Sequence, residues 1–323
     1  MESNATIIPI AAGKGGVGKS FLTANLAMAM AQLGHRTIAV DMDLGGSNLH
    51  TFMGLANRYP GIGDYLQAKS GSLENLLVPT DVENFTFLPG DGKTPFMANI
   101  QYAQKIKLIT QIRKLPAEYI FLDLGAGSSF NTLDFFAISE KGLIITTPEP
   151  PAIMNMLVFL KNFLLRSISR AFSSDHAMNN FLREFYKRPM EDQMSSITSL
   201  RDEIALEDPK AADIIAKIYN SCHPRIVFNF GEHPDELEVT NQIDRRLDAV
   251  LSIAADYFGF VYFDPAIRQA TREQKPLLSL LPESNAASSI HQIARRIEKY
   301  WDVPVKDSAA RLENSVRNTY NSR

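Results

Sequence analysis

Short runs of apolar and β-branched residues recur along the chain, and each run predicts a buried β-strand. Polar residues do not alternate with the apolar ones inside these runs, so both faces of the strands are expected to be covered, as in a parallel sheet. The pattern indicates about seven strands in one sheet. The runs span residues 6–11, 36–41, 85–88, 119–124, 142–147, 225–229 and 260–263.

Stretches with helical periodicity lie between most of these runs. Strands that alternate with helices indicate an α/β fold, in which a mostly parallel, twisted sheet carries helices on both faces. Since all the strands fit one sheet, residues 1–306 are expected to form a single domain. The helical stretches span residues 20–33, 101–115, 151–166 and 286–300.

The segment between about residues 167 and 223 departs from this alternation. It is polar, and it contains helical stretches at 179–188 and 208–220 but no convincing strand. We therefore expect a helical insertion in the domain. The last residues, 307–323, are polar as well, and we expect them to form a mobile tail.

The run LVFLKNFLLRSISRAF, residues 157–172, combines apolar residues with Lys161 and Arg166. Two interpretations are open. A core helix covering the sheet would let both charged side chains reach water along their aliphatic stems. An amphipathic helix would instead dock on a membrane or on a partner protein. Of the two, we expect the core helix.

Composition excludes several classes of protein. The chain of 323 residues has a formal net charge of −3, so no overall positive field attracts nucleic acid. Its one cysteine, Cys222, rules out a disulfide framework and any site that needs paired cysteines from one chain. We recognise neither a signal peptide nor a run of roughly 18 apolar residues. A cytoplasmic protein is expected, and peripheral contact with the inner face of the membrane is left open.

The stretch AAGKGGVGKS, which follows the first predicted strand, fits two glycine motifs. Gly13, Gly15 and Gly18 match the dinucleotide fingerprint, whereas Gly13, Gly18 and the next two residues match the P-loop. Both motifs place a phosphate at a helix N-terminus. Lys19 and Ser20 favour the P-loop, because the lysine reaches the β- and γ-phosphates and the hydroxyl holds Mg²⁺. The residues expected to contact the nucleotide here are Gly13, Gly15, Gly16, Val17, Gly18, Lys19, Ser20 and Phe21.

A second lysine, Lys14, lies inside the loop and completes the motif GKGGVGKS, a deviant Walker A motif. In this respect the chain resembles the MinD/ParA-type (SIMIBI) ATPases. The resemblance implies a P-loop NTPase fold, ATP and Mg²⁺ as cofactors, a homodimer when ATP is bound, and slow hydrolysis stimulated by the dimer or a partner. It also implies that Lys14 reaches across the dimer to the other subunit's phosphates, as an arginine finger does. Phe21 departs from the family, where many relatives have Thr or Ser touching the α-phosphate.

Two acidic segments extend the resemblance. VDMDLGGSN, residues 40–48, is similar to the family's switch segment, which implies that Asp43 positions the attacking water and that Asp41 supports magnesium or the switch. YIFLDL ends a buried strand with Asp123, where a carboxylate is costly unless it is paired or near a metal. It resembles the Walker B aspartate, which implies magnesium held through water by Asp123 together with Ser20.

Later elements resemble the family less specifically. Asn229 ends the predicted strand RIVFN, and the resemblance implies that its amide reads adenine. Asp264 and Pro265 belong to FDPAIRQATREQKP, which is similar to the loop that borders the purine. The segments LDLGAGSS and TTPEPPAI are closer to the flagellar branch of the family, FlhG or FleN, than to ParA.

Three classes of function follow. An ATP-switched positioning protein is preferred, with control of flagellar position or number ahead of MinD-like division placement and ParA-like DNA segregation. Nucleic acid is not an expected partner, because the basic residues are scattered. A metabolic or metal-assembly ATPase is disfavoured, since Cys222 alone cannot hold a cluster. A non-hydrolysing scaffold is disfavoured because the motif residues remain. Leu312, Val316 and Tyr320 form too thin an apolar face for strong membrane binding by the tail.

Overall fold

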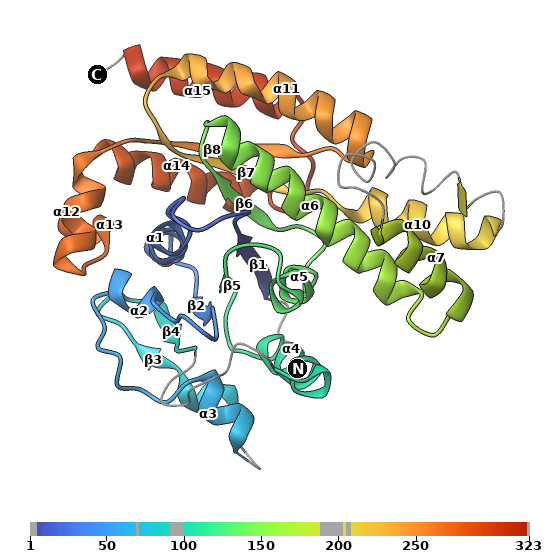
Figure 1. Cartoon of the computed structure of the whole chain (residues 1–323). Helices are drawn as coiled ribbons and strands as arrows, with labels where there is room; N and C mark the ends of the chain where they lie inside the picture. The colour runs from blue at the N-terminus through green and yellow to red at the C-terminus, as the bar shows by residue number, and fades with distance from the viewer. Residues whose placement is uncertain (1–4, 69–70, 91–99, 188–202, 205–207, 322–323) are drawn as a thin grey trace.

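The computed structural model describes residues 5–68, 71–90, 100–187, 203–204 and 208–321 of the chain. Its strands are β1 Thr6–Ala11, β2 Thr37–Met42, β3 Val78–Pro79, β4 Phe85–Leu88, β5 Tyr119–Leu124, β6 Leu143–Thr146, β7 Arg225–Gly231 and β8 Asp256–Tyr262. Across these described ranges, eight strands form one sheet in the order β3-β4-β2-β5-β1-β6-β7-β8 (Figure 1). Neighbouring strands are parallel except β3 and β4. The predicted mostly parallel α/β sheet is confirmed, with one strand more than expected.

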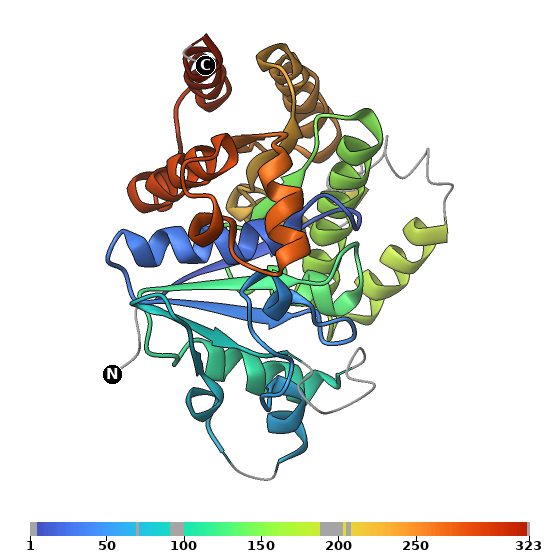
Figure 2. The ribbon, with the colours of Figure 1, turned by 90° about the vertical axis from the view of Figure 1, so that its left-hand side faces the viewer.

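Helices cover both faces of this sheet (Figures 1 and 2). Their bounds are α1 Lys19–Gln32, α2 Leu49–Phe52, α3 Ile62–Gln67, α4 Tyr102–Ile112, α5 Phe130–Phe136, α6 Pro150–Ala171, α7 His176–Lys187, α10 Pro209–Ser221, α11 Val239–Arg246, α12 Pro265–Glu273, α13 Leu277–Leu280, α14 Asn285–Tyr300 and α15 Ser308–Asn321. Three further short helical segments in the described ranges are η1 Leu73–Leu76, η2 Pro234–Glu238 and η3 Leu247–Leu251.

Two hydrophobic cores lie on opposite faces of the sheet, which explains the unbroken apolar runs. Along β5, Ile120 and Leu122 join the core under α4, α5 and α6, whereas Phe121 joins the core under α1 and α14. All three side chains have no exposed surface. Because side chains alternate across a strand, a strand covered on both faces needs an apolar residue at every position.

The long helix α6 covers the sheet, as expected of a core helix. By length and composition it could also cross a membrane, but 61% of its apolar window is buried inside the protein. The expectation that Lys161 reaches water is wrong, because its side chain is only 2% exposed and burial lowers its pKa. Arg166 instead donates two hydrogen bonds to the buried Asp134 of α5, at 2.8 and 2.9 Å.

The predicted insertion is helical where the structure describes it. After α6, which runs on to Ala171, come α7 and α10. Residues 188–202 and 205–207 of this segment lie outside the described residues. The predicted helical insertion at about 167–223 remains a proposal for that part of the chain.

The C-terminal segment is not the mobile tail that its polarity suggested, because it forms helix α15. Leu312 and Val316 are 2% and 5% exposed and pack into the main core, which is the one that contains Ile120 and Leu122. The hydroxyl of Tyr262 on β8 donates to the carbonyl of Val316 at 3.0 Å, and Arg317 pairs with Asp235 of η2 at 2.8 Å. Two buried apolar positions one turn apart, together with this hydrogen bond and ion pair, hold the helix along β8, and a polar composition does not reveal them.

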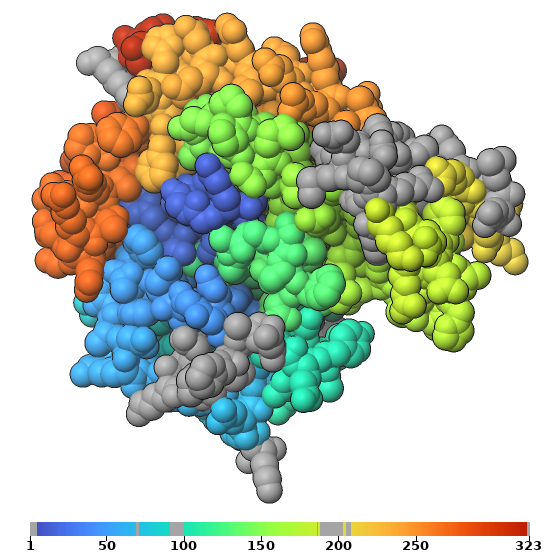
Figure 3. Space-filling model, in the orientation of Figure 1, coloured from blue at the N-terminus to red at the C-terminus, as the bar shows by residue number. Residues whose placement is uncertain are grey.

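Parallel strands bring their carboxyl ends to one edge of the sheet, and candidate chemistry gathers there. Register places Asp41 of β2 beside Asp123 of β5, and Ile10 of β1 beside the same Asp123. This is the edge at which open α/β sheets bind ligands. In Figure 3 the dark-blue glycine loop reaches the surface here, between the green start of α6 and the blue segment after β2.

Candidate functional site

The glycine loop joins β1 to α1 and turns tightly at the helix N-terminus. Gly18 is the N-cap of α1 with φ of 83°, a left-handed conformation that favours glycine. Gly13 lies against the backbone of α6, where an added Cβ would come within 2.3 Å of the carbonyl group of Asn155. The loop therefore has its shape fixed from both sides, with the first N–H groups of α1 free to meet an anion.

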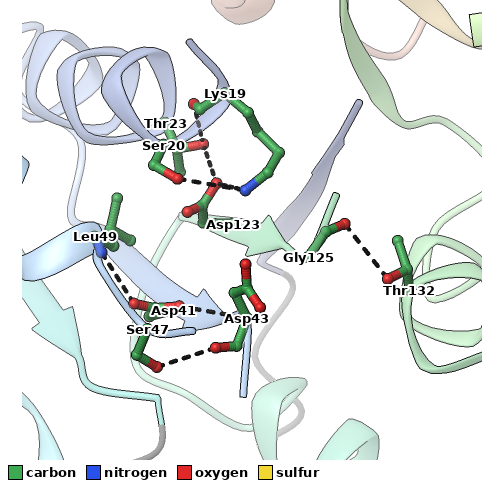
Figure 4. Close-up of polar contacts among 10 residues, drawn as sticks. All are labelled: Lys19, Ser20, Thr23, Asp41, Asp43, Ser47, Leu49, Asp123, Gly125 and Thr132. Atoms are coloured by element: carbon green, nitrogen blue, oxygen red, sulfur yellow. Dashed lines mark hydrogen bonds and ion pairs between the residues drawn. The ribbon is translucent and has the colours of Figure 1, made fainter. Parts of the chain in front are cut away.

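Lys19, Asp123 and Thr23 form a buried cluster at the start of α1 (Figure 4). The Lys19 ammonium lies 2.6 Å from Asp123 Oδ1, and the Thr23 hydroxyl donates to the same oxygen at 3.0 Å. Ser20 Oγ lies 3.4 Å from the Lys19 ammonium. The lysine expected to meet phosphate thus neutralises the expected Walker B aspartate, because a bare buried carboxylate would be costly.

Asp41 holds the loop that carries Asp43. Its Oδ1 accepts from the Asp43 N–H at 3.1 Å and its Oδ2 accepts from the Leu49 N–H at 3.0 Å. Both carboxylate oxygens are engaged by backbone, so the geometry supports the switch role more directly than the metal role. Direct support of magnesium by Asp41 stays a prediction.

The contribution of Asp41 to the stability of the nucleotide-free protein should fall as pH rises from 3.8 to about 8. Burial and then the neighbouring Asp123 raise the pKa of Asp41 from 3.8 to about 8. Between these two values the folded state binds a proton that the unfolded state has lost, so the free energy of unfolding decreases with pH and levels off above the folded-state pKa. Urea unfolding at a series of pH values measures the slope. Asp41→Asn should remove this part of it, and an unchanged slope in the variant would contradict the assignment.

Asp43 lies at the rim of the cluster. Its main-chain carbonyl accepts a hydrogen bond from the Ser47 hydroxyl at 3.2 Å. Its carboxylate lies beside Gly125, where an added Cβ would be 3.4 Å from Asp43 Oδ1, and Figure 4 shows it pointing toward the end of β5. The Asp43 residue is partly buried, and its role in positioning a water stays a prediction.

Asn229 connects β7 to the glycine loop across the site. Its amide Nδ2 donates to the carbonyl of Val17 at 2.9 Å, while its Oδ1 is buried and has no partner among the described residues. Asp123 Oδ2 is the second buried oxygen of the site without a partner there. Unpaired buried polar atoms cost free energy, and such atoms in a folded protein point to a missing ligand, water or ion.

The other predicted contacts are placed less directly. Asp264 caps two helices, since its carboxylate oxygens accept from the N–H groups of Ala266 and Ala286 at 2.9 and 3.1 Å. Pro265 is exposed at the first position of α12. Their contact with a base therefore stays a prediction. Phe21 is 3% exposed and packs edge-on against Phe52 at 6.4 Å, so only its backbone N–H could serve a phosphate.

Lys14 is the unpaired charge of the loop. No hydrogen bond or ion pair of its ammonium occurs within the part of the chain that the structure describes, and the side chain is partly exposed. Gly15 and Gly16 beside it are exposed too. The contact of Lys14 with a second subunit, which the family resemblance implies, stays a prediction.

Sequence reasoning missed several residues that shape the site. Thr23 was detectable, because it lies four residues after Lys19 and therefore on the same face of α1. Gly90, after β4, was not detectable from the sequence, because only the fold brings it next to the loop that carries Asp43 and Ser47. An added Cβ on Gly90 would lie 2.2 Å from Ser47 Oγ and 2.8 Å from the Asp41 carbonyl oxygen. No group of three or more His, Cys, Asp or Glu side chains in the described ranges could hold a metal ion alone.

Comparisons with known proteins show the family of the chain. The sequence matches the CbiA family, described as the CobQ/CobB/MinD/ParA nucleotide binding domain, over residues 8–278. It is 22% identical to the antiactivator FleN of Pseudomonas aeruginosa over 92% of this chain and 88% of FleN. It is 34% identical to the septum site-determining protein MinD of Thermotoga maritima over 49% of this chain and 59% of that protein. The MinD alignment thus spans less than two thirds of either protein.

Solved structures share the fold. MinD of Pyrococcus horikoshii, complexed with Mg-ADP, has a TM-score of 0.57 at 20% identity and covers 91% of this chain and 96% of its own. The ParA family ATPase of Chlorobium tepidum has a TM-score of 0.56 at 16% identity, with coverages of 91% and 99%. With a P-loop NTPase fold of this type and a family match over most of its length, the chain belongs to the CobQ/CobB/MinD/ParA family of nucleotide-binding proteins.

Proposed function

We propose that the protein binds ATP with Mg²⁺ at the glycine loop, dimerises in the ATP-bound state, and hydrolyses ATP slowly. The observation that carries this proposal is the pair of buried oxygens without described partners, Asp123 Oδ2 and Asn229 Oδ1, which belong to side chains that contact Lys19 and Val17 of the glycine loop. A magnesium-bound water would satisfy the first and the amino group of adenine the second. The two atoms therefore suit a ligand that brings both a cation and a donor-bearing base.

The residues act by exchanging partners. Bound phosphates would draw the Lys19 ammonium from Asp123, and Mg²⁺ would replace the lost positive charge beside that carboxylate. Asp123 and Ser20 would hold the ion, which neutralises charge on the transferred phosphoryl group. Asp43 would orient the attacking water, and Lys14 of a second subunit would complete the charge around the phosphates. An isolated chain would then be a poor ATPase by construction.

We propose control of flagellar position or number as the cellular role. The alignment with FleN supports it, since it extends along 92% of this chain. MinD-like division placement is the alternative, supported by higher identity over about half of the chain, 31% over 45% for MinD of Helicobacter pylori. Capture of flagellar basal-body or regulator proteins by the ATP-bound chain would favour the first role, and capture of division proteins the second.

The proposed location is the cytoplasm. Contact with the inner face of the membrane would require a surface other than the apolar face of α15, because Leu312 and Val316 are buried against the main core. The proposed partners are a second copy of the chain and a protein of the polar or flagellar machinery. A metabolic or metal-assembly role stays the third possibility, and no contact around the buried Cys222 supports it.

Asp43→Ala should bind ATP normally and accumulate as a dimer. The substitution removes the carboxylate that would orient water but leaves Lys19 and Lys14, so the ATP-bound state should form and persist. Light scattering coupled to size exclusion, with ATP and Mg²⁺, measures the mass. The wild type should return to monomer as ATP is consumed.

The matched control is Asp64→Ala. Asp64 is also an aspartate, but its carboxylate accepts from the Gly61 N–H at the start of α3, away from the glycine loop. It should dimerise and revert as the wild type does. A monomeric Asp43→Ala protein at saturating ATP would refute the assigned role of Asp43.

A further inference from the structure

A small pocket, open to solvent on one side, lies near the start of β8, at the opposite end of the sheet from Asp41 and Asp123. Its volume is about 150 Å³. That is several times the roughly 30 Å³ that a water molecule takes in the liquid, and below the roughly 300 Å³ of common small-molecule sites. The pocket therefore has room for a compact ligand of a few heavy atoms. Its walls are Tyr257, Phe258, Arg296, Tyr300, Val305, Ser308 and Arg311.

Two guanidinium groups face this pocket from different helices. Arg296 comes from α14 and Arg311 from α15, and none of the residues lining the pocket carries a carboxylate. Arg296 Nη1 donates to the carbonyl of Phe258 at 3.3 Å, and burial lowers the pKa of Arg296. The Arg311 side chain, within the described ranges, makes no hydrogen bond or ion pair. Arg296 is partly buried and Arg311 is exposed, so two positive charges line a pocket that opens to solvent on the Arg311 side and has no carboxylate in its walls.

The remaining polar groups in the pocket are hydrogen-bond donors. The Ser308 hydroxyl accepts from the Tyr257 N–H at 3.1 Å, which leaves its own proton to donate. The Tyr300 hydroxyl has no hydrogen-bond partner among the residues described here. The first turn of α15, a helix of 14 residues, adds free N–H groups at the same place. The side chains of Arg296, Arg311, Ser308 and Tyr300 are thus able to donate, whereas the Tyr257 hydroxyl is engaged by Asp244, and no lining residue is a carboxylate.

Asp256, which directly precedes Tyr257 of the pocket, is engaged elsewhere. Asp256 accepts from the Val305 N–H at 3.2 Å, and it lies 3.0 Å from the His223 ring and 3.8 Å from Arg225. It therefore does not supply the missing negative charge to Arg296 and Arg311.

We infer that this pocket, formed by Arg296, Arg311, Ser308 and Tyr300, is a binding site for a phosphate group. Two guanidiniums with two hydroxyl donors match a doubly charged oxyanion, and arginine binds phosphate oxygens in pairs. A bound phosphate would join α15 to α14, because Arg311 belongs to α15 and Arg296 to α14. Arg296 also donates to the carbonyl of Phe258 on β8. Most of this pocket lies beyond residues 8–278, the part that the nucleotide-binding family covers.

Radiolabelled inorganic phosphate in equilibrium dialysis tests the site, at constant ionic strength and with excess Mg-ADP. The wild type should bind one phosphate per chain outside the glycine loop. Arg311→Gln and Arg296→Gln should each weaken binding by about tenfold or more, since each removes a charged donor. Arg295→Gln is the matched control, because Arg295 is the exposed neighbour on α14 and does not line the pocket.

The single tryptophan, Trp301, gives a local signal in the same titration. It follows Tyr300, is 3% exposed and packs on Phe258 with 5.9 Å between ring centroids. Phosphate should change its fluorescence in the wild type and in Arg295→Gln, but not in Arg311→Gln. Phosphate held by the glycine loop would be insensitive to Arg311→Gln, so this variant separates the two sites.

Saturable binding that is unchanged in Arg311→Gln, or no saturable binding in the wild type, would overturn the inference. A second arm adds glycerol phosphate as competitor. Competition supports a site for an organic phosphate, and lack of competition supports a site for the inorganic ion. The conclusion about the phosphate pocket does not depend on ATP binding at the glycine loop, so a failure of ATP binding would not change it.

Discussion

Lys19→Ala should lose ATP binding, with affinity weakened by about two orders of magnitude or more. Lys19 is the only charged residue in the first turn of α1. Its ammonium lies 2.6 Å from Asp123 Oδ1 in the nucleotide-free protein. Removing it takes away the main cation expected at the β- and γ-phosphates and leaves the Asp123 carboxylate to repel them. Equilibrium binding of fluorescent ATP measures the loss, and near-normal affinity would argue against the site.

The same substitution should also destabilise the nucleotide-free protein. Asp123 has no exposed surface, and loss of its partner leaves a bare buried carboxylate, at a cost of about 3–5 kcal/mol. The double variant Lys19→Ala with Asp123→Asn separates the two effects. It should recover stability in urea unfolding yet still fail to bind ATP. Recovery of binding in the double variant would mean that Lys19 acts only on the fold.

Lys14→Ala should bind ATP but hydrolyse it about 10³-fold more slowly, the lower end of what a charge supplied in trans contributes. It should also dimerise poorly. Lys14 has no described partner within its own chain, so its removal should leave the monomer's stability and nucleotide affinity unchanged. Phosphate release under saturating ATP measures the rate, and wild-type turnover would exclude a catalytic role.

A mixing experiment tests whether Lys14 acts on the other subunit. Neither Lys14→Ala nor Asp43→Ala should hydrolyse ATP alone. In a mixed dimer, the Lys14→Ala subunit keeps its own Asp43 and receives Lys14 from its partner, so one of its two sites is complete. Random pairing would make half of the dimers mixed, so at most roughly a quarter of the wild-type activity should return, and less because Lys14→Ala dimerises poorly. A mixture without activity would place both residues in one subunit's site.

Periodicity was sufficient to predict the sheet but not its edges. Strands with unbroken apolar runs, such as β1 and β5, begin and end as predicted. The two-residue strand β3 has no periodicity to detect, because it is defined only by pairing with β4. β8 begins four residues before the predicted run, since Gly259 resembles a strand breaker. Gly259 is in fact required there, because an added Cβ would lie 2.3 Å from Ile293 of α14.

The motifs located the residues of the site but not their partners in the nucleotide-free protein. The sequence predicts Lys19, Asp123 and Asn229 one by one. It does not show that Lys19 pairs with Asp123, 104 positions away, or that Asn229 binds Val17, 212 positions away. These contacts depend on the strand order and register, which bring the ends of β1, β5 and β7 to one edge. Local spacing carries no information about either.

The two margins of the sheet limit how copies of this protein can associate. β8 would offer backbone groups to a foreign strand, but the Ser308 hydroxyl accepts a hydrogen bond from the Tyr257 N–H and α15 packs against β8 through Val316. At the far margin, β3 has only two residues, and Pro79 has no N–H to give. Short or covered edges of this kind prevent strand addition. Copies of the protein therefore cannot pair edge to edge into a continuous, fibre-like sheet. Self-association must use other surfaces, such as the one where the glycine loop reaches the surface.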